Sequence, residues 1–342
     1  MKIFISGAAG FIGFHLTNLL ANQGHEILGF DNINDYYDIN LKYSRLAQLG
    51  IEKEHISEKV VIKSKTFSNL QFIKADLQDK SLVMKCFADF KPDIVCNLAA
   101  QAGVRYSFEN PYTYIESNVL GFLTILEACR AFPVQHLLYA SSSSVYGLNK
   151  NIPFSVNDKN DSPISLYAAT KKSNELMAHT YSYLFNIPST GLRFFTVYGP
   201  WGRPDMALFK FTKSILAHSP IEVYNQGNMF RDFTYIDDIV HAIVKLIPQV
   251  PVEQNQPWTT APFRILNIGN GSPVNLMDFV HAIEQELGIE AIINYLPLQP
   301  GDVVSTHADT SQLYELIGFK PQTSIKEGIH QFITWYKQHY KQ

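Results

Sequence analysis

The sequence predicts an α/β fold, with a doubly wound parallel sheet and a smaller C-terminal α/β lobe. Over the first 195 residues, short apolar and β-branched runs alternate with helical patterns, and a glycine-rich turn joins the first run to the first helix. Strands that alternate with helices imply βαβ units, hence right-handed crossovers and a parallel sheet covered on both faces. The core of the chain is therefore expected to be one such sheet.

The strands of this sheet can be placed from the pattern. We expect them at Lys2–Ser6, Glu26–Phe30, Gln71–Ala75, Ile94–Leu98, Gln135–Ser141 and Ser189–Phe195. The helical patterns between them include Phe11–Gln23, Lys80–Phe90 and Tyr114–Ala131. Asp35–Leu70 is less regular and rich in Lys, Glu, Ser and Tyr, so it is interpreted as an insertion with one helix near Leu41–Leu49.

Beyond residue 196 the regular alternation of strands and helices ends, and Gly, Pro and aromatic residues interrupt the sequence. Helices are expected there at Ala207–Ala217, Ile236–Leu246 and Leu276–Leu287. No linker composition separates this part, so it predicts a lobe built on the sheet. We divide the chain into a cofactor domain, 1–195 plus about 233–270, and a substrate lobe, about 196–232 plus 271–342. Val250–Pro262 is expected to be a flexible loop.

Composition narrows the class of protein. The chain has 342 residues, 46% of them hydrophobic, and a formal net charge of −3, which gives no electrostatic reason to expect nucleic acid or an anionic membrane as a partner. The three cysteines lack metal-ligand spacing, so no metal is predicted. Met1-Lys2 leads directly into a strand, and no apolar run reaches the ~18 residues of a spanning helix. A cytoplasmic location is expected.

The turn Gly7-Ala8-Ala9-Gly10-Phe11-Ile12-Gly13 follows the first strand and opens the first helix. Glycines here permit a tight turn and close approach of the backbone to a pyrophosphate, which then faces the helix N-terminus. In this strand–turn–helix context the pattern predicts a Rossmann-type dinucleotide site.

Asp31 ends the second strand, where a carboxylate can accept hydrogen bonds from ribose hydroxyls and would repel a 2′-phosphate. This favours NAD over NADP as the cofactor, with Asn32 beside it. Asp76-Leu77 could border the adenine, although a loop-capping role for Asp76 is equally plausible. Leu98-Ala99-Ala100 offers small side chains where the cofactor must pass.

Tyr167 and Lys171 stand four residues apart, so on a helix they project from one face. A phenol near pKa 10 is a poor base at neutral pH, and we expect a nearby ammonium and the nicotinamide charge to favour the phenolate. The serine run at 141–144 ends the fifth strand, at the edge where such sheets place ligands. A hydroxyl there could share a proton with substrate, or could simply be a solvated strand end.

Together these residues resemble the extended short-chain dehydrogenase/reductase family, specifically its nucleotide-sugar epimerases. The similarity runs nearly end to end, and several segments look like bacterial UDP-glucuronate 4-epimerases. These segments are DNINDYYD (31–38), LAAQAGVRYS (98–107), YASSSSVYGLN (139–149), LYAATKK (166–172), GLRFFTVYGPWGRPDMALFKF (191–211), RDFTYIDDI (231–239) and QPGDV (299–303).

The resemblance implies that tightly held NAD⁺ acts as a shuttle. Tyr167 would take the C4 hydroxyl proton while hydride leaves C4, and the 4-keto sugar would then swing and receive hydride on its opposite face. The family spacing selects Ser142 as the assisting serine, with Ser143 as the nearest alternative. The product from UDP-glucuronate would be UDP-galacturonate.

Sibling activities carry acids just before the Val-Tyr-Gly: Thr-Asp-Glu in similar dehydratases and Glu in UDP-glucuronate decarboxylases. Here those positions are Ser143 and Ser144, so dehydration is disfavoured and decarboxylation loses a characteristic residue. A 4-epimerase of a neutral UDP-hexose remains an alternative, as does decarboxylation. A non-catalytic NAD sensor would need a broken Tyr167–Lys171 pair.

The resemblance also implies the substrate contacts. Arg203 is placed against the sugar carboxylate, which an arginine fork suits, and Thr196 stands where galactose epimerases have Asn. Arg105 is a second cationic candidate, with a structural salt bridge as the alternative for either arginine. Arg231 resembles the arginine that grips the diphosphate, and Asp302 the acid that holds the uridine ribose.

Two points of this comparison stay open. Gln299 stands where neutral epimerases have Arg, so the second phosphate partner is in doubt, and Lys210 is a possible substitute. Asp237 in RDFTYIDDI could simply cap the helix near Ile236. The family further implies a homodimer through Tyr114–Ala131 and the Tyr167 helix, and polysaccharide synthesis as the outlet for the product.

Overall fold

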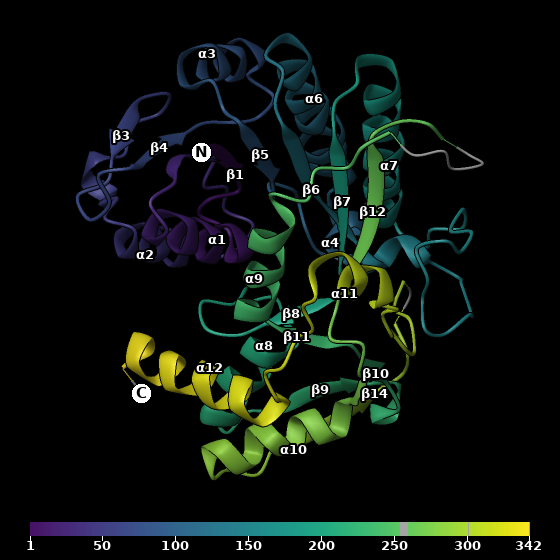
Figure 1. Ribbon diagram of the computed structural model, residues 1–342. Helices are drawn as coiled ribbons and strands as arrows, with labels where there is room; N and C mark the ends of the chain where they lie inside the picture. Colours follow the sequence, from purple (N-terminus) through teal and green to yellow (C-terminus); the bar gives the residue numbers. More distant parts are fainter. Residues whose placement is uncertain (254–258, 300, 342) are drawn as a thin grey trace.

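The computed structural model describes residues 1–253, 259–299 and 301–341 (Figure 1). Within these residues an eight-stranded sheet has the order β12-β7-β6-β5-β1-β2-β4-β3, in which every pairing is parallel except β3 with β4. The predicted doubly wound parallel sheet is therefore confirmed. Its strands are β1 (Lys2–Ser6), β2 (Glu26–Asp31), β3 (Val61–Lys63), β4 (Leu70–Lys74), β5 (Ile94–Asn97), β6 (His136–Ser142), β7 (Ser189–Phe194) and β12 (Phe263–Ile268).

Helices cover both faces of this sheet, as βαβ connections require. One face packs against α3 (Lys80–Phe90), α6 (Gly121–Ala131) and α7 (Leu166–Phe185), around buried Phe4, Phe87 and Phe122. The opposite face carries α1 (Phe11–Asn22) and α9 (Ile236–Leu246), which contact each other. The apolar core continues from that second face into the smaller lobe.

The smaller lobe lies beyond the carboxyl ends of the central strands, at the bottom of Figure 1. Its short strands form three pairs among the described residues, and α8, α10 and α12 pack around them. These elements are β8 (Thr196–Tyr198), α8 (Ala207–Leu216), β9 (Ile221–Tyr224), β10 (Phe230–Arg231), β11 (Phe233–Tyr235), β13 (Val274–Asn275), α10 (Leu276–Leu287), β14 (Ile293–Leu296), α11 (Ser311–Ile317) and α12 (Ile325–Tyr340). Helix α11, which the sequence division places in the lobe, contacts α9 and β12 of the larger unit. Strand β11, which the same division places in the cofactor domain, pairs with β8 of the lobe.

Two segments differ from the sequence prediction. The insertion after β2 contains the expected helix, α2 (Ile39–Gln48), but also the edge strand β3, whose short and largely exposed Val61–Lys63 gave no burial pattern to read. The expected helix over Tyr114–Ala131 is α5 (Pro111–Tyr114), a π-helical segment at Ile115–Leu120, and then α6. A mid-helix π segment widens the turn locally.

The predicted loop Val250–Pro262 includes residues 254–258, which lie outside the described residues, as does Pro300 of the QPGDV segment. The strand order places the topological switch between β1 and β5, because the order runs outward from this point in both directions. Open α/β sheets hold ligands at the carboxyl ends of strands beside such a switch.

Candidate active site

A single continuous pocket opens at this switch point and extends to the smaller lobe. Every site residue predicted from the sequence lines it. From the cofactor end these are Gly7, Gly10, Phe11, Ile12, Gly13, Asp31, Asn32, Asp76, Leu77, Leu98, Ala99 and Ala100. From the chemical and sugar end they are Arg105, Ser142, Ser143, Tyr167, Lys171, Thr196, Arg203, Lys210, Arg231 and Asp302. The structure thus brings together residues nearly 300 positions apart in sequence, although their roles remain predictions.

The glycine turn fits a bound pyrophosphate. A side chain at Gly13 would place its Cβ 2.0 Å from the Gly7 carbonyl oxygen, and one at Gly7 would come within 2.8 Å of the Ala99 amide nitrogen. Gly7 also has φ +75°, which L side chains rarely adopt. Helix α1 begins after Gly10 with no side-chain cap, so its first amides are left for an anion, as a dinucleotide site requires.

Asp31 is buried at the end of β2, and backbone amides orient its carboxylate. Oδ2 accepts from Ala9 N at 3.0 Å and Oδ1 from Ile33 N at 2.8 Å. Each oxygen keeps a lone pair for a ribose hydroxyl. Asp76 accepts from Asn32 Nδ2 at 2.9 Å and from Gln78 N at 2.9 Å, so it organises its loop while also lining the pocket.

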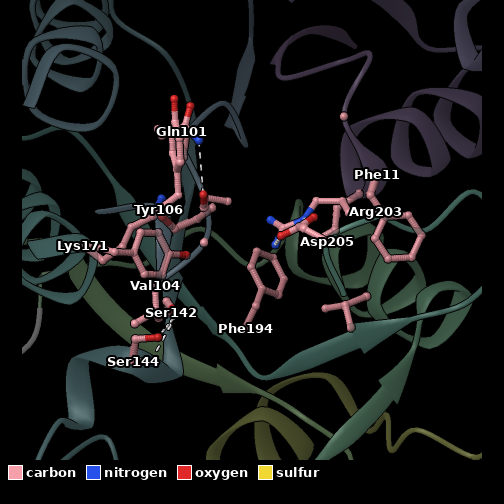
Figure 2. Close-up of a pocket in the computed structure, with 18 of the residues that line it drawn as sticks. Phe11, Gln101, Val104, Tyr106, Ser142, Ser144, Lys171, Phe194, Arg203 and Asp205 are labelled. Atoms are coloured by element: carbon pink, nitrogen blue, oxygen red, sulfur yellow. Dashed lines mark hydrogen bonds and ion pairs between the residues drawn. The ribbon is translucent and has the colours of Figure 1, made fainter. Parts of the chain in front are cut away.

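The chemical end is carried by α7 and the end of β6. The side chain of Ser165 caps α7, accepting from Ala168 N at 3.1 Å, and this sets Tyr167 in the first turn and Lys171 one turn later. Lys171 Nζ donates to the Ala140 carbonyl at 2.8 Å. Ser142 is buried at the strand end, where its hydroxyl donates to Ser144 Oγ at 3.2 Å (Figure 2). These groups converge on the same part of the pocket.

Burial sets the proton affinities of the two residues. It raises the pKa of the Tyr167 phenol above 10.0, and the Ser142 hydroxyl and the Arg203 charge oppose that rise. Desolvation lowers the pKa of Lys171 to about 7. Lys171 is not among the groups that shift the Tyr167 pKa in the polypeptide, and the expected joint effect of the lysine and the nicotinamide charge stays a prediction. A lysine with a pKa of about 7 is only partly protonated at neutral pH, so it contributes little positive charge. Stabilisation of the Tyr167 phenolate therefore depends on other cations.

A buried network fixes the strand end that bears the serines. Ser141 Oγ donates to Glu175 Oε1 at 2.7 Å, and Arg193 pairs with the same carboxylate through Nε at 2.7 Å and Nη2 at 2.9 Å. The Arg193 guanidinium also lies over the Tyr146 ring, 4.8 Å from its centre. Because α7, β6 and β7 all contribute, this network holds Ser142 in register with Tyr167. Sequence reasoning did not identify it.

The sugar end faces these groups from the other side of the pocket (Figure 2). Arg203 is paired with Asp205, with Nε 3.1 Å from Oδ1 and Nη2 2.9 Å from Oδ2. The Tyr36 hydroxyl donates to Asp205 Oδ2 at 3.2 Å. Asp205 and Tyr36 were not predicted as site residues, although both lie within segments that carry the family resemblance.

Two further charged residues meet across the rim. Arg105 Nη2 lies 3.1 Å from Asp302 Oδ2, and its guanidinium lies over the Tyr224 ring, 4.4 Å from the centre. The salt-bridge alternative for Arg105 therefore describes its contact here. Arg231 donates through Nη1 to the carbonyls of Phe230 and Val304, at 3.0 and 3.1 Å. Lys210, on α8, is exposed at the rim.

Arg45 of the insertion helix α2 joins the two ends of the site. It is fully buried and donates through Nη1 to the Ala9 carbonyl at 2.9 Å and through Nη2 to the Trp201 carbonyl at 2.7 Å. Ala9 belongs to the glycine turn, and Trp201 precedes Arg203 by two residues. A buried arginine that satisfies both loops fixes their separation.

The predicted cap of α9 is not formed. Asp237 does not cap α9, because the capping position is Tyr235 and no side chain bonds there. In the described part of the chain, no group of three or more His, Cys, Asp or Glu side chains is arranged to hold a metal ion. Over the same residues, no helix has the length and apolarity needed to cross a membrane.

The fold and the pocket define an α/β protein of the dinucleotide-binding type, whose pocket brings Tyr167, Lys171 and Ser142 together. Residues 3–269 match the NAD dependent epimerase/dehydratase family, and the chain belongs to that family. Its cofactor is therefore NAD, as predicted from Asp31, and the family resemblance read from the motifs is confirmed.

Individual relatives cover the whole chain. It is 55% identical to Protein CapI of Staphylococcus aureus over 100% of both chains. It is 46% identical to a probable UDP-glucuronate 4-epimerase of Rhizobium meliloti, over 100% of this chain and 98% of that protein. A crystal structure of UDP-glucuronic acid 4-epimerase from Bacillus cereus, in complex with UDP-glucuronic acid and NAD, has a TM-score of 0.86 and 32% identity, over 99% of this chain and 100% of that one.

Proposed function

We propose that the protein is an NAD-dependent 4-epimerase that interconverts UDP-glucuronate and UDP-galacturonate through a transient 4-keto sugar. The observation that carries this proposal is a pocket lined by Tyr167, in which Ser142 and Lys171 lie across from the Arg203 guanidinium (Figure 2). A proton-transfer group and a cation thus face one sugar from opposite sides. The relatives named as UDP-glucuronate 4-epimerases support the substrate.

In the proposed mechanism, Tyr167 as phenolate accepts the proton of the C4 hydroxyl, and Ser142 holds that oxygen within hydrogen-bond reach. When bound, NAD⁺ supplies the reversible hydride acceptor that converts the C4 alcohol to a ketone. After the sugar has turned its other face, Tyr167 returns the proton to O4. The starting protonation state of the protein is restored, so no net redox change occurs.

The cofactor would be held by the elements described above. Its pyrophosphate would lie on the uncapped N-terminus of α1, over the glycine turn, and its adenosine ribose on Asp31. Lys171 would grip the nicotinamide ribose, since its Nζ already lies at the end of β6. The charge of the bound ring would supply the phenolate stabilisation that burial of Tyr167 opposes.

For the substrate, we assign the sugar carboxylate to Arg203 and Thr196, which both line the pocket. Arg231 and Lys210 would contact the diphosphate, and Asp302 the uridine ribose. Because Arg105 is paired with Asp302, we assign it to closing the nucleotide end rather than to the carboxylate. Ser143 is a further donor for the sugar, and the absence of an acid at 143 and 144 argues against dehydration and decarboxylation.

The proposal includes a homodimer formed through α5–α6 and α7. Both segments expose large apolar side chains: Tyr112, Ile115, Leu120, Leu176, Tyr183 and Leu184. A face of this kind is typical of subunit interfaces. Sedimentation velocity of the purified protein would report twice the 38.8 kDa chain mass, and the Leu176→Lys variant should shift it toward the monomer. We place the reaction in the cytoplasm, where it would serve polysaccharide synthesis.

The direct test is proton NMR of the purified protein with UDP-glucuronate and no added cofactor, repeated with NAD⁺. We expect anomeric signals of UDP-galacturonate to grow to a stable mixture, without release of CO₂ and without net reduction of NAD⁺. Turnover of UDP-glucose or UDP-N-acetylglucosamine instead would replace the proposed substrate by a neutral UDP-hexose. Release of CO₂ would indicate a decarboxylase.

A further inference from the structure

The arginine assigned to the sugar carboxylate already has an anionic partner in the protein. Asp205 takes the Nε and Nη2 edge of the Arg203 guanidinium, which is the edge that grips a carboxylate with two parallel hydrogen bonds. Nη2 also contacts Met206 Sδ at 3.3 Å. The two side chains are 23% and 24% exposed, so water screens the pair only partly.

This pairing leaves one nitrogen of the guanidinium for a ligand. Among the described residues, no hydrogen bond or ion pair joins Nη1 of Arg203 to the protein. The guanidinium points into the pocket, toward the side that carries Lys171 and Ser142 (Figure 2). A sugar carboxylate would therefore meet a single guanidinium nitrogen, Nη1, on a cation whose charge is largely balanced.

Asp205 is itself held in place from a second side. The Tyr36 hydroxyl donates to Oδ2, and burial raises the pKa of Tyr36, so it remains a hydrogen-bond donor across the neutral range. The carboxylate thus accepts three hydrogen bonds, two from Arg203 and one from Tyr36. It is fixed beside the pocket rather than free to rotate away.

We propose that Asp205 is a specificity-determining and positioning residue, whose fixed negative charge behind Arg203 limits how tightly the site holds an acidic sugar. This inference rests on the proposed function, since it concerns the sugar carboxylate. A bound carboxylate on Nη1 lies near the Asp205 carboxylate, and like charges at short range repel. A neutral sugar at the same place experiences no such repulsion. The acidic sugar is therefore released readily enough to turn within the site.

The test compares two ligands that differ in charge at C6. Calorimetric titration of the NAD-loaded Tyr167→Phe protein with UDP-glucuronate and with UDP-glucose gives both dissociation constants without interconversion. Asp205→Asn keeps the size and one acceptor but removes the charge. Asp205→Glu keeps the charge and is the matched control.

We expect Asp205→Asn to tighten UDP-glucuronate about tenfold and to leave UDP-glucose within about twofold. Asp205→Glu should keep the wild-type ratio of the two constants. In the background with Tyr167 intact, Asp205→Asn should lower KM for UDP-glucuronate without raising kcat. A purely structural role would weaken both ligands together, and thermal unfolding of each variant shows whether the fold is intact.

Three outcomes would overturn the role of Asp205. These are an unchanged ratio of the two dissociation constants, a loss of affinity for both ligands, and a selective loss for UDP-glucuronate. If the protein with Tyr167 intact still epimerises UDP-glucuronate, such a result overturns the role of Asp205 alone. If that protein neither binds nor epimerises UDP-glucuronate, the proposed function fails as well.

Discussion

The two ends of the pocket are built in different ways. At the cofactor end, the site is formed mainly by backbone groups. These are the glycine turn, the uncapped start of α1 and the two amides that orient Asp31. At the sugar end, charged side chains are paired with one another, as Arg203 is with Asp205 and Arg105 with Asp302. A backbone site is preorganised and needs no exchange of partners, whereas paired side chains must share or exchange them when a ligand arrives.

The largest effect should come from the residue between the two ends. Tyr167→Phe removes the phenol that exchanges the C4 proton, and we expect kcat to fall by about 10³-fold, because positioned acid–base groups contribute about 10²–10⁴. Retained NAD should be unchanged. The matched control is Tyr314→Phe, an exposed tyrosine on α11 outside the proposed interface. Comparable loss in both variants would show that the effect is not specific to the Tyr167 phenol.

Gly13→Ala tests the rigidity of the cofactor end. Its Cβ would sit 2.0 Å from the Gly7 carbonyl oxygen, so the turn must move, and we expect retained NAD to be lost. The free energy of unfolding should fall by about 1–3 kcal/mol, the usual cost of overpacking. Urea unfolding and absorbance of released NAD measure the two. The control is Gly24→Ala, where no atom lies within 4 Å of the new Cβ but φ is +81°, so this variant should lose stability through backbone strain and still retain NAD. Equal loss of NAD in the two variants would contradict the close fit at Gly13.

Lys171 predicts a pH dependence of stability. Its pKa is about 7 in the folded protein and 10.5 when unperturbed, so between these values the unfolded chain holds one more proton. Raising the pH therefore stabilises the NAD-free protein relative to Lys171→Met, by ~1.4 kcal/mol per pH unit from about 7 to 10. Urea unfolding of both at pH 7, 8 and 9 measures this. A difference in free energy of unfolding that does not change with pH would contradict this prediction. The control is Lys213→Met at an exposed position, for which the difference from the wild type should not depend on pH.

The smallest effect on stability should come from the rim. Arg105→Gln removes a contact to Asp302 in which the arginine side chain is 42% exposed, so the free energy of unfolding should change by less than about 1 kcal/mol. Titration with UDP should nevertheless show weaker binding, because the nucleotide end loses its closing contact. Retained NAD is the internal control. A large loss of stability, or of NAD, would mean that the two ends are not separable in this way.

The sequence predicts the cofactor end more completely than the sugar end. A glycine turn and a strand-end acid have local spacing rules, and βαβ alternation predicts the parallel sheet around them. Arg105 and Asp302 are 197 residues apart, so no local rule connects them. The sequence also does not show burial, so it could not predict that desolvation lowers the pKa of Lys171 to about 7.

The position of Arg45 has a consequence for dissecting the protein. The Arg45 side chain donates to carbonyls of the glycine turn and of the loop before Arg203. Each loop therefore needs a donor from the insertion to satisfy a buried carbonyl. Deleting helix α2 to obtain a minimal nucleotide-binding fragment would strand buried acceptors in both units. If the lobe were supplied as a separate polypeptide, the hydrogen bond from Arg45 to the Trp201 carbonyl would have to form between two chains. The insertion is therefore needed for both units to fold together. Libraries of variants in which the insertion is shortened through α2 should contain few folded proteins.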